Sequence, residues 1–430
     1  MNDIEKIKNT WCLTPWYEVY LKPEGGVRSC CDNIQESEFQ LNEVNGNIDV
    51  AFNHDHYKTI RKEMLEGKEP DACRRCYAKE RETGSSLRTR RNDKSYLDYL
   101  GMESENIEDV MKNLKVDWSP SNIKKLKVDF SNGCNLKCSM CSPHRSTAWF
   151  KDKIAMDKDF DYSGYYWWRQ IKEPLDTEKQ KFYSSSIPIE FIDNNWNFLR
   201  NLNLIEVSGG EPFFHPQFLY LLDRLVEEKW DGKLTLISNI TLMNDDIIKK
   251  LSKLNTGMCI SIDGIGDLYE YIRPATTIGK YTWSDISETI QKLKSLRTDV
   301  NERGILYTFG YVPQLLNFYN ITDWLDFSVN ALGVLDENRV DVLSGTVLYA
   351  PHFLKICHHP DPHEKKALKN ILEKCYSHIR GVDSIIKGLD AETKFEDWQA
   401  FCKYMNFLDK QRETSIIKYI PQFEKYWIYD

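Results

Sequence analysis

The chain has 430 residues, of which 41% are hydrophobic and 28% are charged, a composition typical of a globular protein with a sizeable core. Its formal net charge of −8 argues against bulk binding of nucleic acid, because contacts to phosphates need a basic surface. The first residues lack an apolar signal segment and no run of about 18 apolar residues occurs, so we expect a cytoplasmic protein without a membrane span.

The 12 cysteines are distributed unevenly along the chain. Eight of them fall within the first 141 residues, where they form groups. Because disulfides are disfavoured in a reducing compartment, grouped cysteines there indicate metal binding or catalysis. The remaining four stand alone and are expected to be small buried core residues, namely Cys259, Cys357, Cys375 and Cys402.

The N-terminal part of the chain is irregular and carries two pairs of cysteines. Cys12 and Cys30 flank a hairpin-like turn of sequence PEGG, which brings the two thiols together, and Cys73 and Cys76 form a C-x2-C pair. Four thiolates from two short elements suit either a zinc ion or a cubane iron–sulfur cluster. Cys31 is an alternative to Cys30, and their adjacency alone does not choose between them.

Basic residues adjoin the second cysteine pair. Positive charge beside a cluster stabilises its reduced form or attracts an anionic substrate, although most such runs are solvated surfaces. The run comprises Arg74, Arg75, Lys79, Arg81, Arg88, Arg90 and Arg91.

Strand-length apolar runs alternate with helical patterns in the middle of the chain. We expect strands at 123–130, 204–207, 234–238, 258–262, 305–312 and 340–349, and helices at 217–230, 245–254, 283–296 and 321–329. This alternation predicts an α/β fold with a parallel sheet. Six strands indicate a partial (β/α)6 TIM-like barrel, whose reactive groups gather at the carboxyl ends of the strands.

These elements suggest three domains. Residues 1–115 form a small irregular N-terminal domain with one helix near 56–65, residues 116–350 form the barrel, and residues 351–430 form a helical C-terminal extension. The barrel contains an insertion at 151–200, whose aromatic residues 165–168 either pack the insertion or roof a substrate cavity.

Three cysteines follow the first barrel strand within eight residues, in the sequence SNGCNLKCSMCSP. Cys134, Cys138 and Cys141 therefore lie on one loop. A structural zinc site needs four ligands, and His144 is the available fourth. Three thiolates on a four-iron cube would instead leave one iron open for a substrate or cofactor.

Polar residues and glycines follow the next three strands. In VSGGEP the glycines allow close approach of the backbone to a ligand, and Glu211 can accept hydrogen bonds from an ammonium group. Arg273 is a natural bidentate partner for a carboxylate. Each of these residues also has an explanation that involves no ligand. GGEP can form a tight turn, Ser238 and Asn239 can form a strand-end turn, and Asp263 can cap a turn. Arg273 can form a surface ion pair with Asp267 or Glu270.

The C-x3-C-x2-C loop after the first strand, with GGEP after the second, resembles the signature of the radical S-adenosylmethionine (SAM) superfamily. The resemblance implies that Cys134, Cys138 and Cys141 hold a [4Fe-4S] cluster whose open iron chelates SAM. Reductive cleavage of SAM then gives a 5′-deoxyadenosyl radical. Met140 departs from the family pattern, which usually has an aromatic residue before the third cysteine.

The same resemblance implies roles for the strand-end residues. The GGE motif, here Gly209, Gly210 and Glu211 followed by Pro212, would contact the methionyl amino group of SAM. Ser238 and Asn239 fall near the expected ribose position. The segment that holds the methionine carboxylate in relatives corresponds to Ser261, Asp263 and Arg273, and Asp263 is also a candidate proton acceptor near the substrate.

The upstream cysteines resemble the half-SPASM, or twitch, module of radical SAM enzymes, which normally follows the barrel but here precedes it. The resemblance implies an auxiliary [4Fe-4S] cluster held by Cys12, Cys30, Cys73 and Cys76. The expected function is a radical SAM oxidoreductase that abstracts a hydrogen from a peptide, sugar or nucleotide substrate. The auxiliary cluster would accept the electron, and a flavodoxin or ferredoxin would supply the reducing electron.

Two alternative functions remain from the sequence: a redox-neutral epimerase or rearrangement enzyme with a cysteine as hydrogen donor, and a zinc-stabilised binding module.

The histidines of the chain offer further candidates. His144 and His215 lie close to the expected site in sequence and are candidates for moving a proton. The segment CHHPDPH at 357–363 suggests metal binding, but its two prolines favour a loop that precedes a helix.

Overall fold

The computed structural model describes residues 3–34, 38–162, 173–276, 281–296, 303–332, 348 and 351–429. The chain forms two compact units, each built from several segments. Unit 1 comprises residues 1–131, 185–236 and 253–256, and unit 2 comprises residues 132–184, 237–252 and 257–430. No helix within the described ranges has the length and apolar character needed to cross a lipid bilayer.

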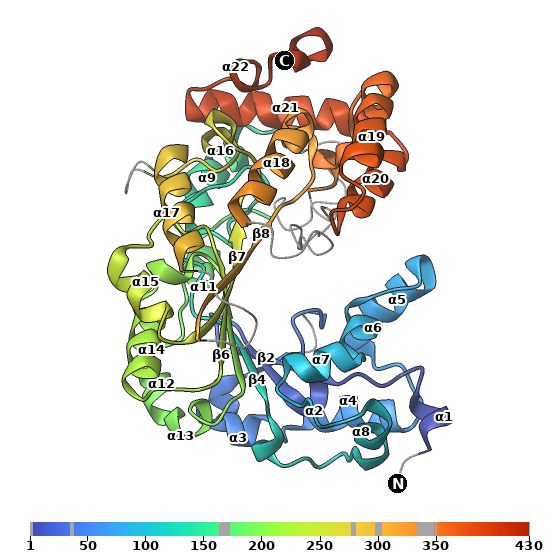
Figure 1. The fold of residues 1–430 in the computed structure, drawn as a ribbon, viewed down its shortest axis with the longest axis vertical. Helices are drawn as coiled ribbons and strands as arrows, with labels where there is room; N and C mark the ends of the chain where they lie inside the picture. The colour runs from blue at the N-terminus through green and yellow to red at the C-terminus, as the bar shows by residue number, and fades with distance from the viewer. Residues whose placement is uncertain are drawn as a thin grey trace. The chain divides into compact units, whose positions relative to one another are not determined.

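Unit 1 contains a sheet whose strands run in the order β3-β2-β1-β4-β5-β6 (Figure 1). The strands are β1 (Glu18–Leu21), β2 (Gly26–Arg28), β3 (Phe39–Gln40), β4 (Lys125–Asp129), β5 (Leu204–Ser208) and β6 (Lys233–Ser238). β4, β5 and β6 are parallel and adjacent in chain order, as in a partial barrel. In unit 2, β7 (Asn255–Ser261) and β8 (Gly304–Gly310) are neighbours. The predicted α/β class is confirmed.

The sheet extends beyond the predicted first strand, because β1 pairs in parallel with β4. The PEGG turn then reverses the chain, so that β2 pairs antiparallel with β1, as the predicted hairpin requires. Five of the six expected strands are present as β4 to β8. The sixth, at 340–349, lies almost entirely outside the described residues, as do the aromatic residues 165–168.

Helices surround these strands. In unit 1 they are α1 (Ile4–Ile7), α2 (Thr14–Tyr17), α3 (Ile48–Ala51), α4 (Asp55–Leu65), α5 (Arg74–Thr83), α6 (Leu87–Arg91), α7 (Lys94–Tyr99), α8 (Ile107–Asn113), α12 (Glu190–Asn194), α13 (Trp196–Leu199) and α14 (Pro216–Glu227). In unit 2 they are α9 (Phe150–Asp159), α11 (Thr177–Tyr183), α15 (Asp245–Leu251), α16 (Asp267–Ile272), α17 (Trp283–Ser295), α18 (Ile321–Leu332), α19 (Pro362–Cys375), α20 (Val382–Asp390), α21 (Phe395–Arg412) and α22 (Ile416–Tyr419).

The two faces of β4 differ sharply in chemistry. Leu126 and Val128 are buried against the apolar core, whereas the alternate residues Lys125, Lys127 and Asp129 occupy the opposite face. Lys125 lies 2.7 Å from a carboxylate oxygen of Glu206 on β5, and Lys127 pairs with the other oxygen. Since these charges are shielded from water, their pairing is what makes their burial tolerable.

The C-terminal extension contributes to the core of unit 2. Trp398, Phe401 and Tyr404 of α21 belong to a buried aromatic cluster that also contains Trp149. Met140, the departure from the family pattern, packs against the edge of this cluster. Of the four isolated cysteines, Cys357 and Cys402 are buried as expected, Cys259 is half-buried, and the expectation was wrong for the exposed Cys375.

Candidate active site

The three cysteines of the C-x3-C-x2-C motif lie on a tightly bonded loop in unit 2. The backbone N–H of Leu136 lies 3.4 Å from Sγ of Cys134, and the N–H of Cys141 donates to the carbonyl of Cys138 at 2.9 Å. Burial raises the pKa of the Cys138 thiol and raises that of Cys141 to about 12. A metal that binds these sulfurs must therefore displace their protons.

Segments that lie far away in the sequence hold this loop by its backbone. The N–H of Ser139 donates to Ile272 O at 2.8 Å, and the N–H of Lys137 donates to Pro274 O at 3.0 Å. Trp149 donates its indole N–H to Cys138 O at 3.0 Å. These three hydrogen bonds hold the backbone of the loop in place.

The long helix α21 of the C-terminal extension also binds the loop. Tyr404 donates its hydroxyl to Ser139 O at 2.7 Å. Arg412, which is buried, donates to Lys137 O at 3.0 Å, to Ser139 Oγ at 3.1 Å and to Asp152 Oδ2 at 2.9 Å. No local pattern in the sequence signals this support, because more than 260 residues separate its partners.

We expect Arg412→Ala to destabilise the protein, because it removes three hydrogen bonds and leaves the buried Asp152 with Lys137 as its remaining ion-pair partner. Breaking a buried ion pair typically costs about 3 kcal/mol or more. Denaturant unfolding measures the resulting decrease in the free energy of unfolding. Lys410→Ala, an exposed position on the same helix, is the matched control, and equal stability of the two variants would refute the role of Arg412.

Arg273 and Asp263 form a buried ion pair beside the cysteine loop. Nε and Nη2 of Arg273 lie 2.7 and 2.6 Å from Oδ2 of Asp263, and Nη1 donates to Cys138 Sγ at 3.6 Å. Asp263 is fully buried, and its Oδ1 accepts the N–H of Val312 at 2.9 Å. The alternative that Arg273 makes a surface ion pair with Asp267 or Glu270 is wrong, because its guanidinium is directed inward.

The end of β6 supplies a second contact to the loop. Asn239 lies with Nδ2 3.9 Å from Cys134 Sγ and 3.2 Å from Asn135 Oδ1. Ser238 accepts the N–H of Ile240 at 2.8 Å, and Ile240 has a φ of 54°, a strained conformation for a β-branched residue. Unit 2 therefore brings together two motif cysteines, Asn239, Asp263 and Arg273. Ser261 lies at the end of β7 and is half-buried.

The GGEP segment follows β5 in unit 1. Gly209 and Gly210 have φ values of 81° and 50°, in the region that favours glycine. A Cβ atom on Gly209 would lie 2.6 Å from Cβ of Asp129. The carboxylate of Asp129 accepts hydrogen bonds from the hydroxyl groups of Ser208 and Tyr20. Glu211 is fully buried and caps the following 3-10 turn, Pro212–Phe214, by accepting the N–H of Phe213 at 3.3 Å.

Gly209→Ala should destabilise unit 1 by about 2–4 kcal/mol, because the methyl group combines a steric clash with an unfavourable φ. Gly84 supplies the control, since it also has a positive φ but has no atom within 4 Å of the position that an added methyl group would occupy. Gly84→Ala should cost only about 1 kcal/mol. If denaturant unfolding showed comparable losses of unfolding free energy for both variants, the contact with Asp129 would be unimportant.

The N-terminal cysteines converge in unit 1. Residues 30–34 lie against residues 72–76, since Ile34 N donates to Ala72 O at 3.1 Å and Cys76 Sγ lies 3.4 Å from Asp32 Oδ2. Asn33 donates to Cys73 Sγ at 3.6 Å. Burial raises the pKa of Cys73 and raises that of Cys76 to about 11, and the nearby Cys12 adds to both shifts. The hydrogen bond from Cys31 and burial raise the pKa of Cys30, and the nearby Cys12 adds to this shift.

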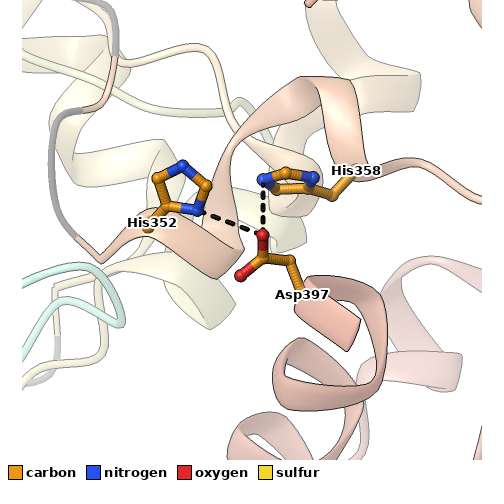
Figure 2. A group of neighbouring side chains, drawn as sticks. All are labelled: His352, His358 and Asp397. Carbon is orange, nitrogen blue, oxygen red and sulfur yellow. Dashed lines mark ion pairs between the residues drawn. The ribbon is translucent and has the colours of Figure 1, made fainter. Parts of the chain in front are cut away.

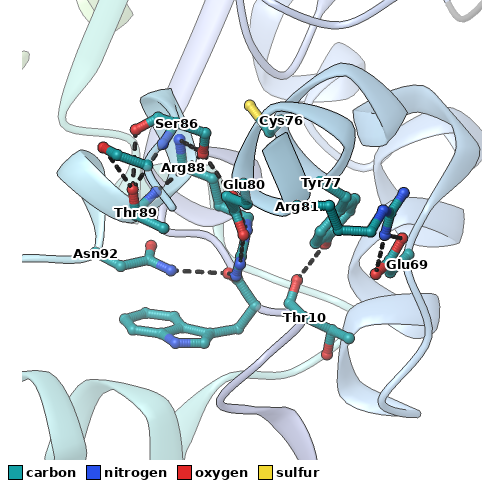
Figure 3. Close-up of polar contacts among 12 residues, drawn as sticks. Thr10, Glu69, Cys76, Tyr77, Glu80, Arg81, Ser86, Arg88, Thr89 and Asn92 are labelled. Carbon is teal, nitrogen blue, oxygen red and sulfur yellow. Dashed lines mark hydrogen bonds and ion pairs between the residues drawn. The ribbon is translucent and has the colours of Figure 1, made fainter. Parts of the chain in front are cut away.

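Several members of the basic run beside these cysteines pair with acidic side chains, and Figure 3 draws two of these pairs. Arg81 pairs with Glu69 at 2.9 Å, and Arg88 pairs with Glu80 while donating to Trp11 O at 2.9 Å. The two remaining pairs are Arg74–Asp71 and Arg91–Glu18. Arg88 and Arg91 are buried rather than solvated, contrary to the expectation for most of this run.

A further group of potential metal ligands lies in unit 2: His352, His358 and Asp397 (Figure 2). Asp397 Oδ2 lies 3.2 Å from His352 Nδ1 and 3.3 Å from His358 Nε2. The N–H of Lys394, however, donates to Nδ1 of His358 at 3.2 Å. The neutral ring then carries its proton on Nε2, which leaves that nitrogen no lone pair for a metal. The contacts favour the predicted loop, with a 3-10 turn at Ile356–His358 before α19.

The two histidines considered as proton carriers have separate surroundings. His144 Nδ1 lies 3.1 Å from the hydroxyl oxygen of Ser142, the residue that follows Cys141 in the sequence. His215 is buried at the start of α14 in unit 1.

The spacing of the sulfurs bears on the choice between zinc and a cluster. Within the described ranges, neither cysteine set brings three sulfurs within 4.8 Å of one another. Tetrahedral zinc with Zn–S bonds of about 2.3 Å requires about 3.8 Å between sulfurs. A cube of four irons and four sulfides is larger and holds its thiolate ligands further apart. In the described residues, no three of these sulfurs are therefore as close together as a tetrahedral zinc site requires, and thiols are the usual ligands of cubane clusters as well as of zinc.

Comparison with known proteins gives a family match to the central part of the chain. Residues 128–314 match the model of the radical SAM superfamily. An uncharacterized protein of Methanocaldococcus jannaschii is 24% identical over 208 residues, which are 46% of this chain and 59% of that protein. The chain thus spans less than two thirds of that relative's length.

Two of the solved structures that are similar to this chain illustrate the match. Streptococcus suis SuiB bound to S-adenosylmethionine is 14% identical, with a TM-score of 0.36 over 83% of this chain and 68% of SuiB. The structure of anSMEcpe with bound AdoMet and the Kp18Cys peptide is 16% identical, with a TM-score of 0.37 over 63% of each chain.

Proposed function

We propose that this protein is a radical SAM oxidoreductase that abstracts a hydrogen atom from its substrate and passes the remaining electron to an auxiliary cluster. The family match at residues 128–314 supports the radical SAM class. The observation that carries the proposal is the cysteine loop, where side-chain N–H groups of Asn239 and Arg273 reach the sulfurs of Cys134 and Cys138. Hydrogen bonds to sulfur stabilise thiolates that ligate iron.

Cys134, Cys138 and Cys141 would hold the SAM-binding [4Fe-4S] cluster. When bound, the cluster and SAM supply the electron transfer that breaks the sulfonium bond and gives a 5′-deoxyadenosyl radical. The chain's own residues orient the loop and its ligands. Arg273 has five N–H donors in a rigid fork, so it can keep Asp263 and still donate to a carboxylate.

Asp263 is better suited to positioning than to proton transfer. Oδ2 accepts two N–H groups of Arg273, and Oδ1 accepts the N–H of Val312. A carboxylate with both oxygens engaged is a poor base but a firm anchor for the guanidinium. We therefore assign Asp263 to holding Arg273, and we assign Arg273 with Ser261 to the methionine carboxylate.

The remaining expected contacts are part of the same proposal. Gly209, Gly210, Glu211 and Pro212 would face the methionyl amino group, where the glycine backbone allows close approach. Ser238 and Asn239 would face the ribose. The buried carboxylate of Glu211 is the natural acceptor for an ammonium group.

Cys12, Cys30, Cys73 and Cys76 would hold the auxiliary [4Fe-4S] cluster in the N-terminal part. Four thiols converge there, which leaves no iron open for substrate and favours a role as electron acceptor. The substrate would be a peptide, sugar or nucleotide, and a flavodoxin or ferredoxin in the cytoplasm would supply the reducing electron. In the net oxidation the substrate loses one hydrogen atom to the 5′-deoxyadenosyl radical, one electron to the auxiliary cluster and one proton to a base.

The double substitution Cys73→Ala, Cys76→Ala tests the auxiliary cluster. Anaerobically purified protein should contain about eight irons per chain, as two four-iron cubes, and the variant about four. Unchanged iron content would refute the second cluster.

A second experiment distinguishes oxidation from the redox-neutral alternative once a substrate is known. The reaction is run in deuterated water and the product is analysed for deuterium. Solvent deuterium on the product carbon would indicate a cysteine hydrogen donor.

A further inference from the structure

Arg91 lies at the end of α6, where its guanidinium meets the sulfurs of two adjacent cysteines. Nη1 donates to Cys30 Sγ at 3.4 Å, and Nη2 lies 4.0 Å from Cys31 Sγ. The side chain is only 8% exposed and packs over the ring of Tyr96. A buried guanidinium aimed at sulfur is unusual, because arginine normally pairs with oxygen anions.

Glu18 on β1 holds this guanidinium in place. Its Oε2 lies 3.2 Å from Arg91 Nη1 and 3.8 Å from Lys125 Nζ, and Oε1 accepts the hydroxyl of Tyr96. An arginine guanidinium is not deprotonated in proteins, so the positive charge beside Cys30 is permanent.

The surroundings of Cys30 and Cys31 differ. Cys30 Sγ receives a second N–H, from Asp32 at 3.4 Å, in the segment that also contacts Cys73 and Cys76. Cys31 is half-buried, and its electrostatic neighbours are Cys30, Arg91 and, on the charged face of the sheet, Lys127 and Glu206. Cys30 differs from it in having Cys12 as a further neighbour and in lying closer to the guanidinium of Arg91.

We propose that Arg91, anchored by Glu18, is a positioning residue that selects Cys30 over Cys31 as ligand of the auxiliary cluster and raises the reduction potential of that cluster. The inference rests on the proposed auxiliary cluster. A cation and two N–H donors at one ligating sulfur offset the negative charge that reduction adds, and so favour the reduced form. Such a cluster is a better electron acceptor, as the proposed oxidation requires.

Ligand choice is tested with Cys30→Ser and Cys31→Ser in full-length protein that also carries Cys134→Ala, Cys138→Ala and Cys141→Ala. This background isolates the auxiliary cluster and should hold about four irons per chain. Cys30→Ser should lose most of this iron and Cys31→Ser should keep it. The reverse result would overturn the choice of ligand. Absence of iron from the background protein would instead overturn the auxiliary cluster, and the inference with it.

The potential is tested with Arg91→Gln in the same background, by redox titration followed by electron paramagnetic resonance. We expect the ratio of reduced to oxidised cluster at a fixed potential to fall at least tenfold, a shift of about 59 mV for one electron. Arg61→Gln is the control, because Arg61 is buried in unit 1 but donates to Pro15 O and Phe52 O rather than to sulfur. An unchanged potential in Arg91→Gln, or an equal shift in both variants, would overturn the inference.

Arg91→Lys covers the case in which Arg91→Gln fails to fold. It keeps the charge that balances Glu18 but cannot reach both Glu18 and Cys30 in the same fork geometry. The midpoint potential should shift in the same direction by a smaller amount, with an altered resonance spectrum. A potential and spectrum identical to those of the parent protein would overturn the role of Arg91.

Discussion

Cys138→Ala is expected to abolish the formation of 5′-deoxyadenosine and to reduce the iron content from about eight to about four atoms per chain. Cys138 is the buried cysteine of the loop, whereas Cys134 and Cys141 are half-buried, and Arg273 donates to its sulfur. Loss of one of three ligands should prevent stable assembly of the SAM-binding cluster but leave the N-terminal cysteines intact. Iron analysis together with chromatographic detection of 5′-deoxyadenosine after dithionite reduction measures both effects.

Cys375→Ala is the control for this prediction, since Cys375 is exposed and lies on α19 of the same unit. It should retain the iron and the activity of the parent protein. If Cys138→Ala also retained its full iron content and SAM cleavage, the cysteine loop would not be the cluster site.

The second large effect is expected at the Arg273–Asp263 pair. Arg273→Lys keeps a positive charge but loses the fork that contacts Asp263 and Cys138 together, so KM for SAM should rise at least about tenfold, or about 1.4 kcal/mol. Asp263→Asn leaves a buried guanidinium without its anion and should cost about 3–5 kcal/mol of stability. Steady-state kinetics and denaturant unfolding separate the two effects.

The two variants distinguish positioning from proton transfer by Asp263. If Asp263 only holds Arg273, Asp263→Asn should raise KM for SAM and leave the pH profile of kcat unchanged. A pH profile that loses one of its limbs in Asp263→Asn would instead identify Asp263 as the base. Normal KM in both variants would remove this pair from the SAM site.

Much of the barrel could be predicted from the sequence because its signals are local. The apolar runs that became β4 to β8 lie within a few residues of their predicted positions, and the helices after them carry clear amphipathic patterns. The cysteine spacing and GGEP are likewise short motifs. β1 escaped prediction because it has only four residues, Glu18–Leu21, and two of them, Glu18 and Tyr20, are polar residues buried on the charged face.

The supports of the candidate site were not predictable, because each depends on residues far apart in the chain. Arg412 and Tyr404 reach the cysteine loop from α21, more than 260 residues away. Arg91 looked like one member of a solvated basic run until the fold buried it against Glu18, 73 residues earlier. A pattern of charges along the sequence does not reveal which charges will be paired inside.

Formation of 5′-deoxyadenosine by the anaerobically purified protein, with SAM and dithionite, tests the central claim most directly. The proposed function predicts a brown, iron-containing protein that produces 5′-deoxyadenosine only when dithionite is present. A colourless protein with tightly bound zinc and no SAM cleavage would contradict it.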